Sequence, residues 1–132
     1  MGPGGAEVVL SSTQDSARRW EASVRNNIGV ALGQLGRHEE ALGQLQQALA
    51  IRERGTNAHA TRVAHWMVAR TLRSLQRHDE ALAIQLRLER EFDAAGQPHP
   101  YVFEELEALY LATDDTAKAE HYVARKAAAS KP

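Results

Sequence analysis

Two short stretches place a histidine directly before two acidic residues: residues 38–40 read His-Glu-Glu and residues 78–80 read His-Asp-Glu. A histidine beside carboxylates can transfer protons or hold a metal ion. A zinc-binding helix, however, needs a second histidine one turn further along, and neither stretch has one. The other four histidines lie apart from one another. We therefore predict no metal site and interpret His38 and His78 as packing residues.

Other catalytic motifs are absent from the sequence as well. It has no cysteine nucleophile, no glycine-rich phosphate loop after a strand and no nucleophile elbow. The adjacent acids Asp114-Asp115 and Glu104-Glu105 lie where we expect a helix cap and a solvated helix face. We predict that the protein is not an enzyme and that it needs no cofactor.

The charge balance argues against several classes of partner. The 132 residues contain 16 Lys and Arg against 17 Asp and Glu, which gives a net charge of −1. Such a balance does not favour binding to nucleic acid or to an anionic membrane, and Arg18, Arg19 and Arg25 form only a modest basic patch. No apolar run approaches the ~20 residues of a membrane helix. The absence of cysteine suits a reducing compartment, so we expect a cytoplasmic protein without nucleic-acid or membrane partners.

The elements that carry these residues are predicted to be helices. No proline occurs between residues 4 and 97, and Ala, Leu, Glu, Gln and Arg, which lose little on entering a helix, dominate. Apolar residues recur every three or four positions, as in Trp20, Val24, Ile28, Leu32 and Leu35, which predicts an inward-facing stripe. Similar stripes follow, separated by short turns. We predict an all-α fold of six helices.

The two histidine-acid stretches belong to a longer internal repeat. Shifting the sequence by forty residues superposes residues 32–42 on residues 72–82 with seven identities. His59 and His99 are also forty residues apart. Self-similarity with this period indicates stacked structural units, none of which can bury its apolar face alone.

These units resemble tetratricopeptide repeats, which are helix–turn–helix units with the pattern W-x2-L-G-x2-Y followed by A-x3-F and a further Ala. The first unit fits well, the second lacks the late Ala and the third is degenerate. The matching residues are, unit by unit, Ile28, Gly29, Leu32, Ala41, Leu45 and Ala48; Val68, Ala69, Leu72 and Ala81; and Leu106, Tyr110 and Ala119. The resemblance covers about residues 22–129.

The spacing between units is 40 and then about 38 residues, whereas the standard repeat has about 34 residues. The surplus lies in residues 54–60 and 94–100, and the second of these loops ends in His99-Pro100. Lengthened repeats with such a loop resemble those of kinesin light chains.

The resemblance implies a right-handed α-solenoid of about three repeats. We expect residues 12–130 to form one domain, with repeats at about 22–54, 62–94 and 100–129. Residues 1–11 are expected to be a flexible terminus or a cloning remnant.

The resemblance also implies that the first helix of each repeat lines a concave groove that binds a peptide. In the family, an Asn at the position of Asn27 often holds a ligand's main chain. Arg70 and Arg73 could grip a carboxylate, and Trp66 and Tyr101 could be apolar anchors. The family pattern places the following side chains in the groove: Asn26, Asn27, Val30, Gln34, Trp66, Met67, Arg70, Arg73, Ser74, Tyr101 and Glu104.

Structural roles are open for the same residues. Trp66 could pack between repeats, Arg70 and Arg73 could be solvated or pair with Glu104 or Glu105, and Asn27 could cap or bridge helices. The chain also departs from the family's two-Lys, two-Asn clamp for C-terminal carboxylates, because no Lys precedes Lys118.

The function predicted from the sequence is a protein–protein interaction module that binds a peptide or partner segment in its groove. The alternative is a structural module that self-associates, as a homodimer or as part of a larger array. The sequence does not indicate which protein is the partner.

Overall fold

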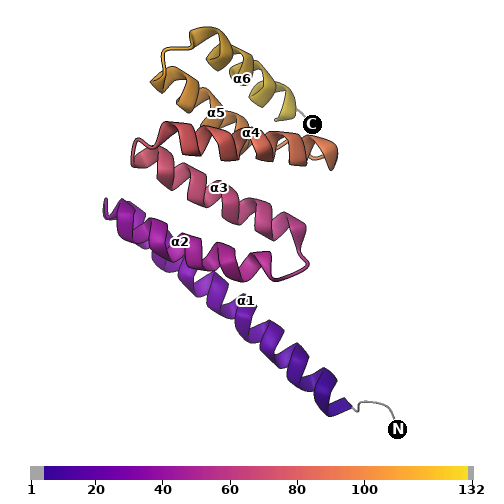
Figure 1. The fold of residues 1–132 in the computed structure, drawn as a ribbon. Helices are drawn as coiled ribbons and strands as arrows, with labels where there is room; N and C mark the ends of the chain where they lie inside the picture. Colours follow the sequence, from indigo (N-terminus) through magenta and orange to yellow (C-terminus); the bar gives the residue numbers. More distant parts are fainter. Residues whose placement is uncertain (1–4, 131–132) are drawn as a thin grey trace. The chain divides into compact units, whose positions relative to one another are not determined.

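The structure of the protein is a computed structural model that describes the backbone of residues 5–130 and the side chains of residues 13–130. Residues 5–130 contain six helices and no strand, which confirms the predicted all-α class (Figure 1). No helix among them has the length and apolar character needed to cross a membrane. The helices are α1 (Gly5–Gln34), α2 (His38–Glu53), α3 (Ala58–Ser74), α4 (His78–Ala94), α5 (Pro100–Ala112) and α6 (Thr116–Ala129).

The first helix begins earlier than the sequence suggested. Ser11 and Gln14 have the spacing of a capping box, but both lie inside α1, so they do not mark a helix start. Residues 5–11, expected to be flexible, belong to the same helix. Residues 1–4 of that stretch lie outside the described residues. After Pro3 no residue before Pro98 lacks a backbone N–H, so nothing in the local sequence stops the helix.

The predicted apolar stripe of α1 is wrong at three of its large residues, because Trp20, Ile28 and Leu35 are all exposed. Trp20 and Leu35 are each 71% exposed, and the buried positions among residues 13–34 of the helix are instead the small residues Ala22 and Gly29. A Cβ atom at position 29 would lie 2.8 Å from the side chain of Leu45, so this glycine permits a close approach of the two helices.

Four helices end in the same backbone motif. The third residue after the end of each of these helices donates a backbone hydrogen bond across the turn in a Schellman arrangement, for example from Arg37 to the carbonyl of Leu32 and from Arg77 to that of Leu72, both at 2.9 Å. This motif needs a residue with positive φ. The residues that adopt it are Gly36, Gln76, Gly96 and Asp114. Positions 36 and 76 are forty residues apart, so the turn repeats with the sequence.

The echoed histidine-acid stretches form the starts of α2 and α4. In each case the arginine before the helix forms two hydrogen bonds with the glutamate three residues later: Arg37 with Glu40 at 3.0 and 2.6 Å, and Arg77 with Glu80 at 2.9 Å twice. This side-chain pair lowers the pKa of Glu80 from its ordinary value. The acids therefore pair at the helix start, where negative charge is also favoured by the helix dipole.

The described chain divides into two compact units, and the boundary falls within α3. We call Met1–Ala64 unit 1 and His65–Pro132 unit 2. In unit 1, α1 and α2 run side by side (Figure 1). The face that α2 buries consists of Ala41, Leu42, Leu45 and Ala48, as its repeat pattern predicts.

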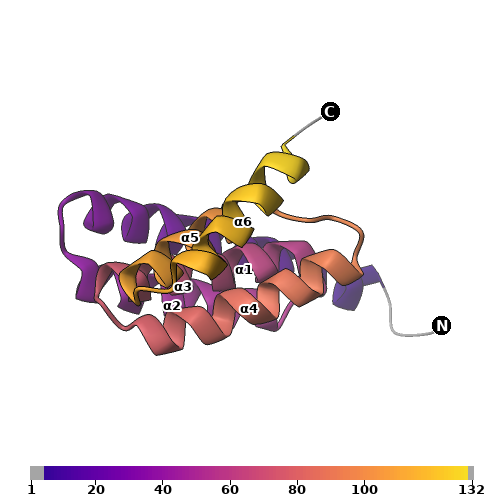
Figure 2. The same ribbon diagram turned by 90° about the horizontal axis from the view of Figure 1, so that it is seen from above.

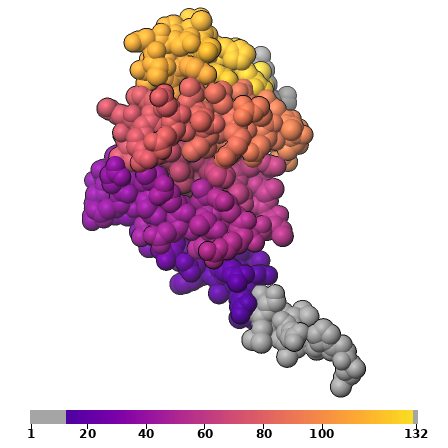
Figure 3. Space-filling view, in the orientation of Figure 1, coloured from indigo at the N-terminus to yellow at the C-terminus, as the bar shows by residue number. Residues whose placement is uncertain are grey.

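Unit 2 has a core built from α4, α5 and α6. The helices α5 and α6 lie side by side in both ribbon views (Figure 1 and Figure 2). The space-filling view shows the side chains of α4, α5 and α6 as one continuous body (Figure 3). The buried residues of this core are Leu88, Phe92, Val102, Phe103, Leu106, Tyr110, Ala119 and Tyr122.

One polar side chain lies in the interior of unit 2. Gln85, on α4, is completely buried, and neither its amide oxygen nor its amide nitrogen has a hydrogen-bond partner among the described residues. It occupies the position where the repeat pattern has a large apolar residue. A buried amide without partners opposes folding, because it loses its hydrogen bonds to water.

Candidate functional site

Trp66 and Tyr101 form the centre of the predicted site in unit 2. The indole Nε1 of Trp66 donates a hydrogen bond of 3.2 Å to the backbone carbonyl of Tyr101, and the two ring centroids are 6.1 Å apart. Trp66 is half-buried and packs against the core of unit 2. Tyr101 is 59% exposed. Trp66 therefore connects α3 to the start of α5, while the Tyr101 ring faces solvent.

Arg70 lies one turn after Trp66 and extends the same surface. Its guanidinium is 5.4 Å from the centroid of the Trp66 ring, in the range of a cation–π contact. Arg70 is exposed, and no ion pair joins it to any carboxylate among residues 13–130. Its N–H donors are thus available to a partner.

Arg73 is engaged within the protein. Its guanidinium donates two hydrogen bonds to the carboxylate of Glu105, at 2.8 and 2.9 Å. The side chain of Glu105 is almost fully buried, whereas that of Arg73 is partly exposed. These hydrogen bonds raise the pKa of Arg73, and its partial burial opposes the increase. The internal pairing that the sequence left open for Arg73 is the arrangement found here.

The remaining predicted residues of unit 2 have smaller roles in the geometry. Glu104 lies on the same face of α5 as Tyr101 and accepts a hydrogen bond of 3.2 Å from Lys126 on α6. The Ser74 hydroxyl donates to the carbonyl of Arg70, and Met67 is half-buried. We define the α3–α5 surface by the four residues that remain accessible or partly accessible together: Trp66, Arg70, Tyr101 and Glu104.

The predicted residues of unit 1 lie along α1. Asn26, Val30 and Gln34 are four residues apart in turn, so they share one face of the helix. Asn27, Val30 and Gln34 are exposed, and Asn26 is half-buried. The side-chain oxygen of Asn26 has no hydrogen-bond partner among the described residues. We call these four residues the α1 stripe.

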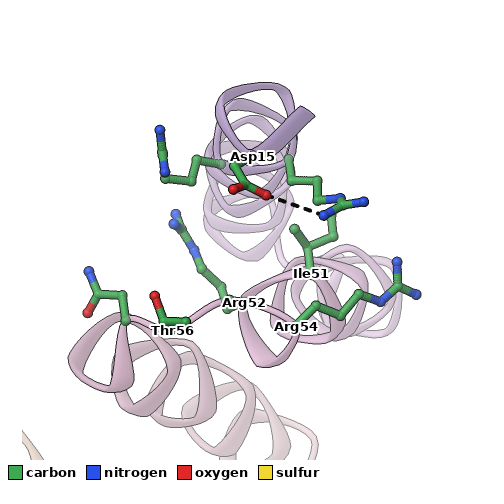
Figure 4. A pocket seen from close by; sticks show the side chains of 9 residues that line it. Asp15, Ile51, Arg52, Arg54 and Thr56 are labelled. Carbon is green, nitrogen blue, oxygen red and sulfur yellow. Dashed lines mark hydrogen bonds and ion pairs between the residues drawn. The ribbon is translucent and has the colours of Figure 1, made fainter. Parts of the chain in front are cut away.

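Unit 1 also contains a pocket that sequence reasoning missed (Figure 4). The sequence grouped Arg18 and Arg19 with Arg25, but Arg25 bonds instead to Glu21 and Gln44. The rest of the pocket is lined from the end of α2, where Arg52 and Arg54 come just before Gly55. These two closely spaced arginines are the sequence signal that could have indicated the pocket. The lining residues are Asp15, Arg18, Arg19, Ile51, Arg52, Arg54, Gly55, Thr56 and Asn57.

Comparison with known proteins identifies the repeat family. No curated protein sequence matches the chain. A family model described as tetratricopeptide repeat matches residues 20–90, which is more than half of the 132 residues. Proteins of this family are generally protein–protein interaction modules. The resemblance to kinesin light chains in particular stays a prediction. The helical architecture and the family match agree, and the chain belongs to the tetratricopeptide repeat family.

Proposed function

We propose that the chain is an interaction module that binds a segment of a partner protein on the α3–α5 surface. The observation that carries this proposal is the exposed Tyr101 ring beside Trp66, together with Arg70, which lies over the Trp66 ring and has no ion pair with a carboxylate among residues 13–130. Aromatic and arginine side chains are enriched among residues that dominate interface energies. A rigid indole held by a backbone hydrogen bond loses little conformational entropy on binding.

The chemistry of this surface favours a particular kind of segment. Arg70 can bind a carboxylate through two parallel N–H donors. Tyr101 offers a flat apolar ring for an aliphatic or aromatic side chain. We therefore propose a partner segment that carries an acidic residue next to an apolar one. The α1 stripe is a separate part of this proposal, in which the amides of Asn26 and Asn27 would pair with an extended main chain.

Arg73 has a different place in the proposal from the one that the sequence suggested. Its two donors already bind Glu105, so we assign it a positioning role between α3 and α5 and not a direct contact with a partner.

A peptide array screened with Arg70→Ala and Tyr101→Ala variants tests the proposal. Peptides selected by the wild-type chain are expected to bind each variant at least about tenfold more weakly, because a lost hot spot costs about 2 kcal/mol or more. Arg90→Ala is the matched control, since Arg90 is an exposed arginine on α4. If Arg70→Ala and Tyr101→Ala both bind the peptides as well as the control does, the assignment of the α3–α5 surface is wrong.

A second candidate function is self-association through α6. Val123 on this helix is half exposed, so its apolar side chain is accessible to a second copy of the chain. Light scattering over a range of concentrations tests this candidate. A mass that rises with concentration, and that Val123→Asp returns to the monomer value, supports it; a strict monomer excludes a homodimer.

The proposed activity is binding alone. Members of the family are typically non-catalytic, and we propose neither an enzymatic reaction nor a cofactor for this chain. The cytoplasmic location stays a prediction.

A further inference from the structure

We infer that the pocket of unit 1 is an anion site that binds the phosphate group of a phosphorylated partner protein. Among the nine described residues that line it, four are arginines and only Asp15 is acidic. These described side chains carry a formal charge of +3, in a chain whose net charge is −1. We call it the arginine pocket. The inference does not rest on the α3–α5 surface, which belongs to unit 2.

The arginines of this pocket are less neutralised than others in unit 1. Arg25 pairs with Glu21 and Arg37 pairs with Glu40. In the pocket, by contrast, only Arg18 has an acidic partner within the part of the chain whose side chains are described, namely Asp15 at 3.4 Å (Figure 4).

The other three arginines of the pocket have no ion pair with a carboxylate among residues 13–130. Arg19 and Arg52 bond to the hydroxyls of Ser16 and Ser23, at 3.1 and 3.3 Å. These hydroxyls are neutral, so the positive charge of the pocket remains uncompensated.

The side chains approach the pocket from two elements. Figure 4 shows Arg52 extending from the end of α2 toward Asp15 on α1, while Arg54 extends on the other side of Ile51. Arg18 and Arg19 come from α1. A planar carboxylate is satisfied by one guanidinium fork, whereas a phosphate monoester presents three acceptor oxygens in different directions. Donors from two elements therefore suit a phosphate better than a carboxylate.

Charge and size agree with this ligand. A phosphomonoester carries about −1.5 to −2 at neutral pH, which the lining charge can compensate. The cavity volume is about 200 Å³. Sites for drug-sized ligands have about 300–1,000 Å³, so this pocket suits a small group and not a large cofactor.

The two helix ends at the pocket do not determine whether the pocket is positively or negatively charged. The pocket includes the N-terminal side of α3, where Asn57 caps the helix by accepting a hydrogen bond from the Ala60 N–H at 3.0 Å. It also includes the C-terminal end of α2. The partial charges of these two ends are opposite and each about half an elementary charge, so they largely offset each other. The arginines make the site positive.

The small extent of the positive surface favours the phosphate of a phosphorylated protein over the phosphates of a nucleic acid. Nucleic-acid binding usually neutralises several phosphates along an extended basic track. Here the uncompensated arginines are among the residues that line one small cavity, and the two other arginines of α1 and the turn after it, Arg25 and Arg37, are paired with acids. A single phosphorylated serine or threonine in a partner segment fits this arrangement.

The test uses the full chain and a fluorescent Gly/Ser-rich nonapeptide that contains one phosphoserine. Fluorescence polarisation should show at least tenfold tighter binding of this peptide than of its unphosphorylated form. Amide resonances of Gly55, Thr56 and Asn57 should shift in ¹⁵N NMR spectra on addition of the phosphopeptide. Arg52→Gln should weaken binding at least fivefold, as should Arg54→Gln.

Arg37→Gln is the matched control, because it removes the same charge at the opposite end of α2, roughly 22 Å away along a 15-residue rise. It should leave binding within twofold of wild type, and circular dichroism checks that every variant folds. Arg70→Ala should also leave this binding unchanged, so failure of the α3–α5 proposal and of this one are distinguishable.

Three outcomes would overturn the inference. They are equal binding of the phosphorylated and unphosphorylated peptides, equal losses in Arg52→Gln and Arg37→Gln, and tighter binding of a single-stranded oligonucleotide than of the phosphopeptide. Inorganic phosphate that competes as strongly as the phosphopeptide itself would overturn the protein source and assign the pocket to a free anion.

Discussion

The guanidinium of Arg73 on α3 donates two hydrogen bonds to the carboxylate of Glu105 on α5, and the Glu105 side chain is only 5% exposed. A carboxylate at this depth is costly unless it is paired, because it has lost its hydration. The pair therefore links two helices of unit 2 and uses donors that would otherwise be available to a ligand.

Removing one member of this pair should destabilise the protein. Arg73→Met leaves the buried Glu105 carboxylate without its partner, and we expect a loss of about 3 kcal/mol in the free energy of unfolding, measured by urea denaturation. The double variant Arg73→Met/Glu105→Leu should recover most of this loss, because it removes the buried charge as well. A double variant as unstable as the single one would contradict this account.

Replacing Gln85 by Leu should stabilise the protein. The side chains are similar in size, and the change removes two buried polar atoms that have no partner among the described residues. We expect a gain of about 1–2 kcal/mol in thermal or urea unfolding. Gln46→Leu, at an exposed position of α2, is the control and should change stability by less than about 0.5 kcal/mol. A loss of stability in Gln85→Leu would show that its amide has a partner in solution.

Gly36 and Gln76 occupy equivalent turns, so replacing each by the residue type of the other tests how the turn backbone affects stability. Both have positive φ, at 78° and 61°, which costs a non-glycine residue about 1–2 kcal/mol. Gln76→Gly should therefore stabilise the protein by about 0.5 kcal/mol, after the larger entropy of glycine in the unfolded chain is subtracted. Gly36→Gln should destabilise it by about 1 kcal/mol. No atom lies within 4 Å of a Cβ built at Gly36, so crowding does not confuse the comparison. Changes of the same sign in both variants would refute the backbone explanation.

Tyr122 should make stability depend on alkaline pH. Burial is the main cause that raises the pKa of the Tyr122 phenol above its ordinary value of 10.0, and its hydrogen bond of 2.8 Å to Glu89 is the second cause. Arg125 bonds to the same glutamate and to Asp93, so this cluster joins α4 to α6. Because the folded state favours the neutral phenol, its contribution is complete below about pH 10 and is lost as pH rises toward the folded pKa.

Unfolding experiments between pH 9 and 11.5 measure this effect. Wild type should lose more stability across this range than Tyr122→Phe, which has no phenol to ionise. Glu89→Gln should lower the pKa of Tyr122 in an absorbance titration. Parallel pH profiles for wild type and Tyr122→Phe would rule out the proposed linkage.

Much of the fold was predictable because its causes are local. Helix-forming composition, the scarcity of proline and apolar periodicity indicate six helices, and the forty-residue echo identifies equivalent turns. The same local reading was wrong where packing decided the result. Trp20, Ile28 and Leu35 follow the apolar spacing but are exposed, because Gly29 and Ala22 are the buried positions among residues 13–34 of α1.

The candidate sites were only partly predictable. The repeat pattern placed Trp66, Arg70 and Tyr101 on one surface, but it could not assign the donors of Arg73, since their partner lies 32 residues away. Nor could it bring Arg18 and Arg19 together with Arg52 and Arg54, which are separated from them by more than thirty residues.

The sequence by itself determined the helices, the repeated turns and the repeat family, because these depend on propensity and spacing along the chain. Only the tertiary structure decided which arginines remain available. Arg73 is bound to a buried carboxylate, Arg70 lies over an indole, and Arg52 faces a small cavity with little opposing charge. The availability of a charged group depends on what surrounds it in space, and residues distant in sequence provide those surroundings.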